Sequence, residues 1–266
     1  LDQTRATTLH LRRWLARSIL AYTTGWWHRS YSAKATCQCA LLRRWHERGA
    51  RLIALTTCEE DLVLQDAQGT AVPLRQVCWA AGREGELEGL LEDVDVLVIN
   101  HGINSHGDRS AAATAAALEV NALSAWRLLE LFAAVVQRRQ AASPQQEPRP
   151  RAEVWVNTSE AEIQPALSPL YEISKRLLGQ LLSLRALDLA DTLRIRRLVL
   201  GPFRSALNPY GVMAADWVAG EILRQARWDL GLIIVTPNPL TYVLMPLVTL
   251  GRTIYFRITS RRAKQP

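Results

Sequence analysis

Residues 154–159 (Val-Trp-Val-Asn-Thr-Ser) followed by residues 171–175 (Tyr-Glu-Ile-Ser-Lys) decide the fold of this 266-residue chain. The first stretch is an apolar strand pattern that ends in hydroxyl residues, and the second opens an amphipathic helical pattern. Tyr171 and Lys175 are four residues apart, so they share one helical face, where the ammonium can lower the pKa of the phenol. The pair also fits a solvated contact on a surface helix. Its position after a strand-end hydroxyl favours a proton-transfer site.

Strand patterns alternate with helix patterns along the chain. We expect strands at 51–57, 76–79, 95–100, 153–158, 194–200 and 232–236, and helices at 40–48, 84–92, 112–137, 171–187 and 214–228. Short apolar strands alternating with helices predict an α/β fold, a doubly wound parallel sheet (Rossmann-like) in a single domain. The polar, proline-bearing stretch 137–152 is expected to form a surface loop. In such a sheet, ligands bind at the carboxyl ends of the strands.

The strand, loop and Tyr-x-x-Ser-Lys order resembles the short-chain dehydrogenase/reductase family, whose catalytic group is Ser-Tyr-Lys with a helix asparagine. The resemblance implies that Tyr171 exchanges a proton with a carbonyl or alcohol oxygen, while Lys175 tunes the phenol and binds the cofactor ribose. Ser159 would hydrogen-bond the developing alkoxide, and Asn121 would hold a water linked to Lys175. The family spacing is commonly one residue longer, so Thr158 is an alternative to Ser159. Two alternatives stay open. Asn121 is also consistent with a polar residue on an otherwise apolar helix, and Ser159 is also consistent with a helix or turn cap.

The cofactor residues that the resemblance implies lie at two further strand ends. Residues 95–102 resemble the family's Asn-Asn-Ala-Gly strand end and keep Asn100 and Gly102. Residues 198–205 resemble the segment after the sixth strand, with Gly-Pro in place of Pro-Gly. Three more residues join Tyr171 and Lys175 as cofactor-binding candidates on that basis: Gly201, Pro202 and Ser205.

A narrower resemblance extends over roughly residues 48–258. It is to the dehydrogenase half of the bifunctional sterol desaturase/short-chain dehydrogenase proteins, and rests on residues 99–104, 156–162 and 200–203.

Residues 1–39 do not fit the rest of the chain. The family begins with a strand and a Gly-rich turn whose backbone lies against the cofactor pyrophosphate. Here Trp26 and Trp27 follow Gly25, and no glycine occurs again before Gly49. We therefore expect a disrupted first strand and Gly-rich loop, and interpret residues 1–39 as an atypical segment from a frame, deletion or gene-model error. The dehydrogenase domain then spans 40–258, and 259–266 form a basic tail.

The choice between NADP and NAD depends on the end of the second strand, where an acidic residue favours NAD. Residues 56–60 read Thr-Thr-Cys-Glu-Glu. Glu59 at the ribose would favour NAD, whereas Thr56 and Thr57 there would not repel a phosphate. We favour NADP.

No metal site is expected. The cysteines (Cys37, Cys39, Cys58 and Cys78) lack the spacing of a four-ligand site and fit free thiols. His101 and His106 have no carboxylates at ligand spacing, so they are expected to line the crevice.

Charge and hydropathy limit the partners. The chain has a net charge of +7 and is 48% apolar, which excludes a disordered chain. Its basic residues are scattered, so a nucleic acid partner is not expected.

Residues 232–250 are strongly apolar and a basic tail follows. Three prolines divide this segment, which argues against a membrane-spanning helix. The alternatives are a seventh strand with a packed helix, or a helix in peripheral contact with a membrane. We expect a cytoplasmic location; the oligomeric state, monomer or homo-oligomer, stays open.

Two functions from different classes remain. One is a nicotinamide-dependent oxidoreductase acting on a small-molecule carbonyl or secondary alcohol with lipid-like character. The other is a catalytically inactive protein of the same fold, which has lost its cofactor loop and acts as an interaction module.

Overall fold

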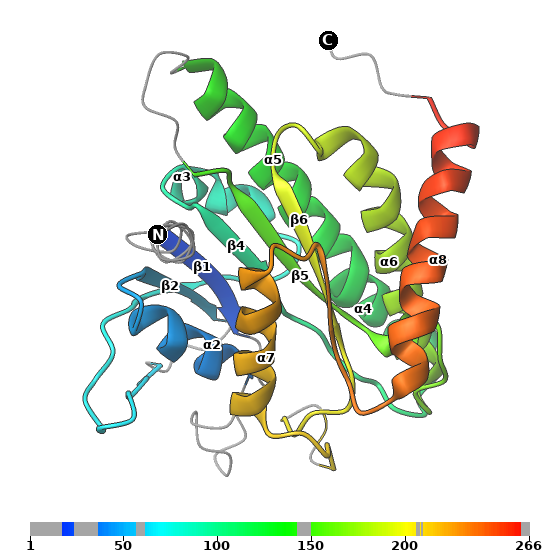
Figure 1. Cartoon of the computed structure of the whole chain (residues 1–266), viewed down its shortest axis with the longest axis horizontal. Coiled ribbons are helices and arrows are strands. Elements are labelled where there is room, and N and C mark those ends of the chain that lie inside the picture. The colour runs from blue at the N-terminus through cyan, green and yellow to red at the C-terminus, as the bar shows by residue number, and fades with distance from the viewer. Residues whose placement is uncertain are drawn as a thin grey trace, which may run out of the picture.

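The computed structural model describes residues 18–23, 37–56, 62–142, 150–205, 208 and 210–261. Seven strands in this part of the chain form one parallel sheet in the order β3-β2-β1-β4-β5-β6-β7 (Figure 1). The strands are β1 (Ser18–Thr23), β2 (Arg51–Thr56), β3 (Arg75–Cys78), β4 (Val96–Ile99), β5 (Glu153–Ser159), β6 (Arg194–Leu200) and β7 (Leu232–Val235). The order reverses between β1 and β4. The predicted doubly wound α/β fold is confirmed.

Helices cover both faces of the sheet. They are α2 (Cys37–His46), α3 (Glu88–Leu91), α4 (Ala111–Leu118), α5 (Ser124–Ala142), α6 (Pro169–Leu189), α7 (Ala215–Arg227) and α8 (Pro239–Thr259). Short 3₁₀ turns lie at Glu84–Leu87 and Glu160–Glu162, and a π-helical turn at Glu119–Leu123 joins α4 to α5.

Two apolar clusters hold these layers together. One packs α2 and α7 on one face of the sheet, around Trp45 and Trp155. The other packs α3, α5 and α6 on the opposite face, around Phe132. In Figure 1, α8 stands beside α6 at the β7 edge. Burial of these apolar side chains is the main force that stabilises the sheet between its helices.

The first strand is intact, which corrects the expected disruption. β1 lies in the middle of the sheet and pairs with β2 along its whole length and with β4 over three residues. Ile19 and Ala21 are buried in the first cluster. Ser18 N–H donates to the Asp95 carboxylate at 2.9 Å. The buried Ile19 and Ala21 therefore place β1 inside the fold, although residues 18–23 belong to the segment 1–39 that we interpreted as atypical. Residues 24–36, where the Gly-rich turn was expected, lie outside the described residues.

Several element boundaries also differ from the sequence expectations. Helix α5 continues to Ala142, so the expected loop 137–152 begins later, and residues 143–149 lie outside the described part. The single helix expected at 84–92 is a 3₁₀ turn followed by α3.

The C-terminal apolar segment forms β7 and then one continuous helix, α8. The Asn238 side chain caps it by accepting from Leu240 N–H at 3.0 Å, and Pro239 occupies its first turn, where the missing N–H costs nothing. Pro246 was expected to divide this segment, but it lies on the exposed side of the helix, where its ring disturbs no packing. Of the helices that the structure describes, none has the length and hydropathy needed to cross a bilayer.

Candidate active site

The candidate site lies at the carboxyl edge of the sheet, where β4, β5 and β6 end. The register places Ile99 beside Val156 and Ser159 beside Leu200, so the residues that follow these strands open onto the same edge. This edge adjoins the reversal of strand order, where open parallel sheets bind ligands. Helix α6 approaches it from the second face and brings Tyr171 and Lys175 toward the strand ends.

Tyr171 and Lys175 lie together, as their spacing predicts. Lys175 is 2% exposed, and its Nζ lies 5.6 Å from the centroid of the Tyr171 ring. The ammonium donates a hydrogen bond to the backbone oxygen of Asn157 at 3.1 Å. Burial lowers the pKa of Lys175 to about 8, and the nearby Glu162 carboxylate acts in the opposite direction. Near neutral pH the pair therefore keeps a buried cation next to a phenol.

The expected lowering of the Tyr171 pKa is not found. Burial raises the pKa of the phenol, the side-chain hydrogen bond with Ser159 acts to lower it, and the charge of Glu160 raises it further. The physical reason is that desolvation of the phenolate outweighs its stabilisation. Tyr171 is consequently protonated at neutral pH and is equipped to donate a proton.

Ser159 and Thr158 point to different places because side chains alternate along a strand. The Ser159 hydroxyl meets the phenol of Tyr171 and also caps the 3₁₀ turn by accepting from Ala161 N–H at 3.2 Å. Thr158 donates to the Leu198 backbone oxygen on the neighbouring strand. The structure thus brings Ser159, and not Thr158, to the phenol. Ser159 also serves as the turn cap that was the alternative expectation for it.

Asn121 connects the β4 end to α6. It is fully buried in the π-helical turn, an irregularity often found at functional sites. Its Oδ1 accepts from Ile103 N–H at 2.7 Å, and its Nδ2 donates to Ile103 O and to the Ser174 hydroxyl at 3.0 and 2.9 Å. Both amide protons are thereby used, so Asn121 positions the loop after β4 against the helix that carries Tyr171. The water-holding role stays a prediction.

The loop after β4 brings three more predicted residues to this edge. Asn100 is buried and accepts a hydrogen bond from the Asn157 side chain. A Cβ on Gly102 would lie 3.1 Å from Asn121 Oδ1 and 3.9 Å from Lys175 Nζ, so this glycine abuts the site directly. His101 is buried with its ring edge-on to Trp79, and burial lowers its pKa to about 3, which keeps the imidazole neutral.

The segment after β6 lies at the same edge but is less closely joined to the phenol. Gly201 N–H donates to Val235 O, and the Pro202 oxygen accepts from Val212 N–H, both at 2.9 Å. The Ser205 hydroxyl accepts from Asn208 N–H at 3.2 Å, so it stabilises its own turn. No contact of Ser205 with Tyr171 or Lys175 is found in the described residues, and its cofactor role stays a prediction.

Gly201 is required by close packing. A Cβ at this position would lie 2.3 Å from Thr236 Oγ1 and 3.0 Å from the Thr236 backbone. We expect Gly201→Ala to lower the free energy of unfolding by about 1–3 kcal/mol, because the overpacked strand end must shift. Gly251→Ala on α8 is the matched control, since nothing lies within 4 Å of its Cβ and alanine favours the helix by about 0.5–1 kcal/mol. Chemical denaturation measures both, and equal stability of the two variants would contradict the packing argument.

Two site residues were missed from the sequence. Asn157 lies in β5 beside Thr158 and Ser159, and the strand pattern alone does not indicate a role for it. Glu162 is 2% exposed, pairs with Arg252 of α8 at 2.8 Å, and acts on Lys175 through its charge. No sequence pattern signals Glu162, because its position depends on the path of the β5–α6 loop and on the docking of α8.

The residues around Lys175 fit the ribose side of a nicotinamide cofactor. An ammonium has three donors, and the structure gives Nζ one protein acceptor, Asn157 O, among the described residues. The Asn157 Oδ1 atom is buried without a hydrogen-bond partner in the same region. Donors and acceptors left free beside Tyr171 suit the hydroxyl groups of a sugar.

The structure describes part of the other half of the predicted cofactor site, at the end of β2. Thr56 is buried and accepts from the Gln76 side chain at 3.1 Å, so it is engaged within the sheet. Residues 57–61, which include Thr57 and Glu59, and residues 24–36, which include Trp26 and Trp27, lie outside the described residues. From the first turn of α2, Gln38 reaches the Asn100 oxygen at 3.4 Å.

In the described residues, no group of three or more His, Cys, Asp or Glu side chains could hold a metal ion. Cys37 has a free thiol, and burial raises its pKa to about 12. His106 follows the β4 loop with a positive φ of 49° and is exposed.

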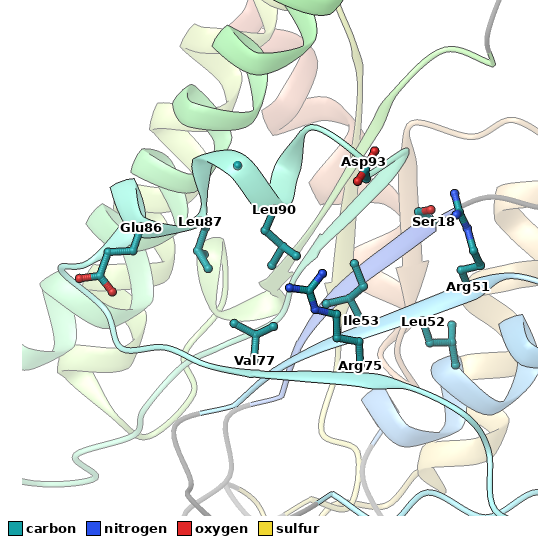
Figure 2. A pocket seen from close by; sticks show the side chains of 11 residues that line it. Ser18, Arg51, Leu52, Ile53, Arg75, Val77, Glu86, Leu87, Leu90 and Asp93 are labelled. Atoms are coloured by element: carbon teal, nitrogen blue, oxygen red, sulfur yellow. The ribbon is translucent and has the colours of Figure 1, made fainter.

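A separate pocket opens at the opposite edge of the sheet, where the strands begin (Figure 2). Ser18, Arg51 and Arg75 mark the first residues of β1, β2 and β3, and Asp93 and Glu86 come from the segment before β4. Because it lies at the amino ends, this pocket is distinct from the carboxyl edge that carries Tyr171.

Comparisons with known proteins agree on the fold. The chain resembles a bulky-bulky ketone specific alcohol dehydrogenase from Comamonas testosteroni, at 15% identity and a TM-score of 0.67 over 94% of this chain and 97% of that one. It resembles a short-chain dehydrogenase from Sphingobium yanoikuyae in complex with NADPH, at 16% identity and a TM-score of 0.65 over 94% and 98%. The chain therefore has the fold of the short-chain dehydrogenases and reductases.

Among curated proteins, the chain is 44% identical over 224 residues to the monoglucosyldiacylglycerol epimerase of Synechocystis sp., a match that covers 84% of this chain and 52% of that protein. The chain thus spans about half the length of this relative. No family model matches the chain. The relative is an epimerase and not a sterol desaturase, so the narrower resemblance to sterol desaturase/dehydrogenase proteins finds no support here.

Proposed function

We propose that the chain is a member of the short-chain dehydrogenase/reductase family that oxidises and reduces a secondary alcohol and its carbonyl on a lipid-like substrate, with NADP favoured over NAD. The observation that carries this proposal is the convergence of Tyr171, Ser159 and Lys175 at one strand edge. The fold neighbour from Sphingobium yanoikuyae holds NADPH, which supports the choice of cofactor.

The residues divide the work by their chemistry. Tyr171 would donate its proton to the substrate carbonyl oxygen, and Ser159, already bonded to the phenol, would hydrogen-bond the same oxygen as it gains charge. Lys175 would hold the ribose hydroxyls and favour the phenolate after proton transfer. Asn100 and Gly102 would border the site of the nicotinamide ring. The far side of that site would be formed by Gly201, Pro202 and Ser205. A bound nicotinamide would supply or accept the hydride.

The curated relative favours one reaction of this class, the epimerisation of a hydroxyl-bearing carbon in a glycolipid. Removing hydride from such a carbon and a proton from its hydroxyl oxygen gives a ketone, and returning hydride to the opposite face of the ketone carbon and the proton to its oxygen gives the inverted alcohol. As a phenolate, the form that the Lys175 ammonium would favour, Tyr171 would take the hydroxyl proton in the first half, and it would return that proton in the second. The electrons removed in the first half return in the second, so the reaction needs no net oxidant.

The experiment is incubation of the chain with monoglucosyldiacylglycerol and a sub-stoichiometric amount of NADP, followed by proton NMR of the sugar ring and by nicotinamide absorbance. Inversion at one ring carbon without accumulation of NADPH supports epimerisation. Ketone formation matched by NADPH supports simple dehydrogenation. Neither change with this lipid or with a panel of ketones and alcohols contradicts the proposal.

The second candidate is the inactive interaction module, and the observation that favours it is the Trp26-Trp27 pair in place of a Gly-rich turn. Indole rings cannot replace a backbone that lies flush against a diphosphate. Fluorescence titration with NADPH and NADH separates the two candidates. Binding that is absent in this chain and restored by a grafted Gly-rich loop before Ala40 would identify an enzyme that has lost its cofactor loop.

A further inference from the structure

Helix α8 presents an apolar face to the outside. Positions three or four residues apart along it share one side of the helix and are all between 49% and 78% exposed. We call this row the apolar stripe, and it consists of Leu240, Val243, Leu247, Leu250, Ile254 and Ile258. The helix stands at the outer edge of the fold beside α6 (Figure 1). A contiguous exposed apolar row of this kind marks an interaction surface.

The orientation of α8 is fixed by polar contacts on its inner side. Thr241 donates to the Glu160 carboxylate at 3.1 Å and accepts from Gln164 at 2.7 Å. Further along the same helix, Arg252 pairs with the buried Glu162 carboxylate at 2.8 Å. The inner side of α8 therefore carries Thr241, Arg252 and the fully buried Met245, whereas the apolar stripe faces outward. Rotating the stripe inward would break these buried contacts, so the stripe stays available to a partner.

The charge of the same region identifies the chemistry of that partner. Five basic residues and no acidic residue occur after Asp229: Arg252, Arg257, Arg261, Arg262 and Lys264. Arg257 and Arg261 are exposed at the C-terminal end of α8, next to the last residues of the stripe. An apolar row that ends in exposed cations is complementary to a layer of acyl chains under anionic headgroups.

A second copy of the chain fits this surface less well. If two α8 helices packed in parallel, the arginines of one would face those of the other. If they packed antiparallel, each arginine would face the uncharged first turns of its partner, because α8 carries no carboxylate. Both arrangements leave the cations without an opposite charge, whereas lipid phosphates supply one.

We propose that α8 is a membrane-docking helix that lies along the surface of an anionic bilayer. The apolar stripe enters the boundary between headgroups and acyl chains, and Arg257 and Arg261 contact lipid phosphates. The helix is about 30 Å long, so it lies in the interface plane along its length. The inference concerns a surface outside the carboxyl-edge crevice, so it goes beyond the proposed function and does not depend on it.

The test is co-sedimentation of the full chain with vesicles of phosphatidylcholine alone and of phosphatidylcholine mixed with phosphatidylglycerol. We expect binding to the mixed vesicles that weakens as salt is raised. Leu247→Glu/Ile254→Glu should lower the partition coefficient by about tenfold or more, because charge enters the buried side of the docked helix. The matched control is Val63→Glu/Trp217→Glu, which places the same charges at exposed apolar positions outside α8 and should bind as the unmodified chain does.

The melting temperature of each variant shows whether it is folded. The variant Arg257→Glu/Arg261→Glu provides a second comparison, because it changes the charge next to the apolar stripe and leaves the stripe intact. Three outcomes would overturn the proposal. They are no binding to mixed vesicles by the unmodified chain, equal losses in the stripe and control variants, and a dimer by light scattering that the stripe variant dissociates while vesicle binding is absent. The last result would assign the stripe to a second copy of the chain.

Discussion

Replacing Tyr171 by phenylalanine is expected to lower kcat/KM by about 10²–10⁴-fold while leaving NADPH affinity and stability nearly unchanged. The phenol is the proton donor at the site, and the variant removes only its oxygen. Ser159 lies within hydrogen-bond reach of that oxygen and Lys175 lies 5.6 Å from the ring, so both partners stay in place. Initial rates with a carbonyl compound that the unmodified chain reduces measure the effect.

Tyr242→Phe is the matched control for this loss. Tyr242 is 48% exposed on α8, and its phenol donates to Thr236 O at 3.3 Å, outside the proton-transfer group. It should keep kcat/KM within about threefold of the unmodified chain, as surface changes usually do. Equal activity of Tyr171→Phe and Tyr242→Phe would show that Tyr171 does not transfer the proton.

The largest loss of stability is expected from Glu153→Ala. Glu153 and Arg196 form an ion pair across β5 and β6 with both side chains buried, at 2.7 Å between Nε and Oε2. Trp155 Nε1 donates to the same carboxylate at 2.9 Å. Removing the carboxylate leaves the buried guanidinium without this partner, which lowers the free energy of unfolding by about 3–5 kcal/mol. Asp229, 41% exposed, still contacts Arg196 at 2.9 Å and keeps the cost within this range.

Denaturant unfolding of the two variants Glu153→Ala and Glu86→Ala provides the comparison. Glu86 pairs with Arg83 at the surface, where both side chains are more than half exposed, so its loss should change the free energy of unfolding by less than about 0.5 kcal/mol. A Glu153→Ala variant as stable as Glu86→Ala would show that the buried pair contributes nothing that apolar packing cannot replace.

Much of the fold was predictable because its signals are local. Alternating apolar strands and helices implied the parallel sheet, and parallel strands bring their carboxyl ends to one edge. That rule predicts from the sequence that Asn100, Ser159 and Gly201 lie at the same edge. Helical spacing placed Tyr171 over Lys175 in the same way. The first strand was not predicted, because the missing glycines after Gly25 indicated a disrupted segment although Ile19 and Ala21 just before them are apolar.

The remaining features depend on contacts between distant parts of the chain. The pKa of Tyr171 rises because its surroundings desolvate the phenolate, and burial cannot be read from a four-residue spacing. Glu162 acts on Lys175 through its charge and pairs with Arg252 of α8, and both contacts join residues that are far apart in the sequence. The outward direction of the apolar stripe likewise needs the structure, because the sequence shows an apolar segment without saying which side packs inward.

The most direct test of the central claim, a nicotinamide-dependent site built around Tyr171 and Lys175, is a binding titration of the full chain with NADPH and NADH. We predict saturable binding of NADPH, weaker binding of NADH, and at least a tenfold loss of affinity in Lys175→Ala, because this ammonium has donors to spare for the ribose. Tyr171→Phe should bind as the unmodified chain does. Absence of binding to either dinucleotide would contradict the account and leave a dehydrogenase fold without dehydrogenase chemistry.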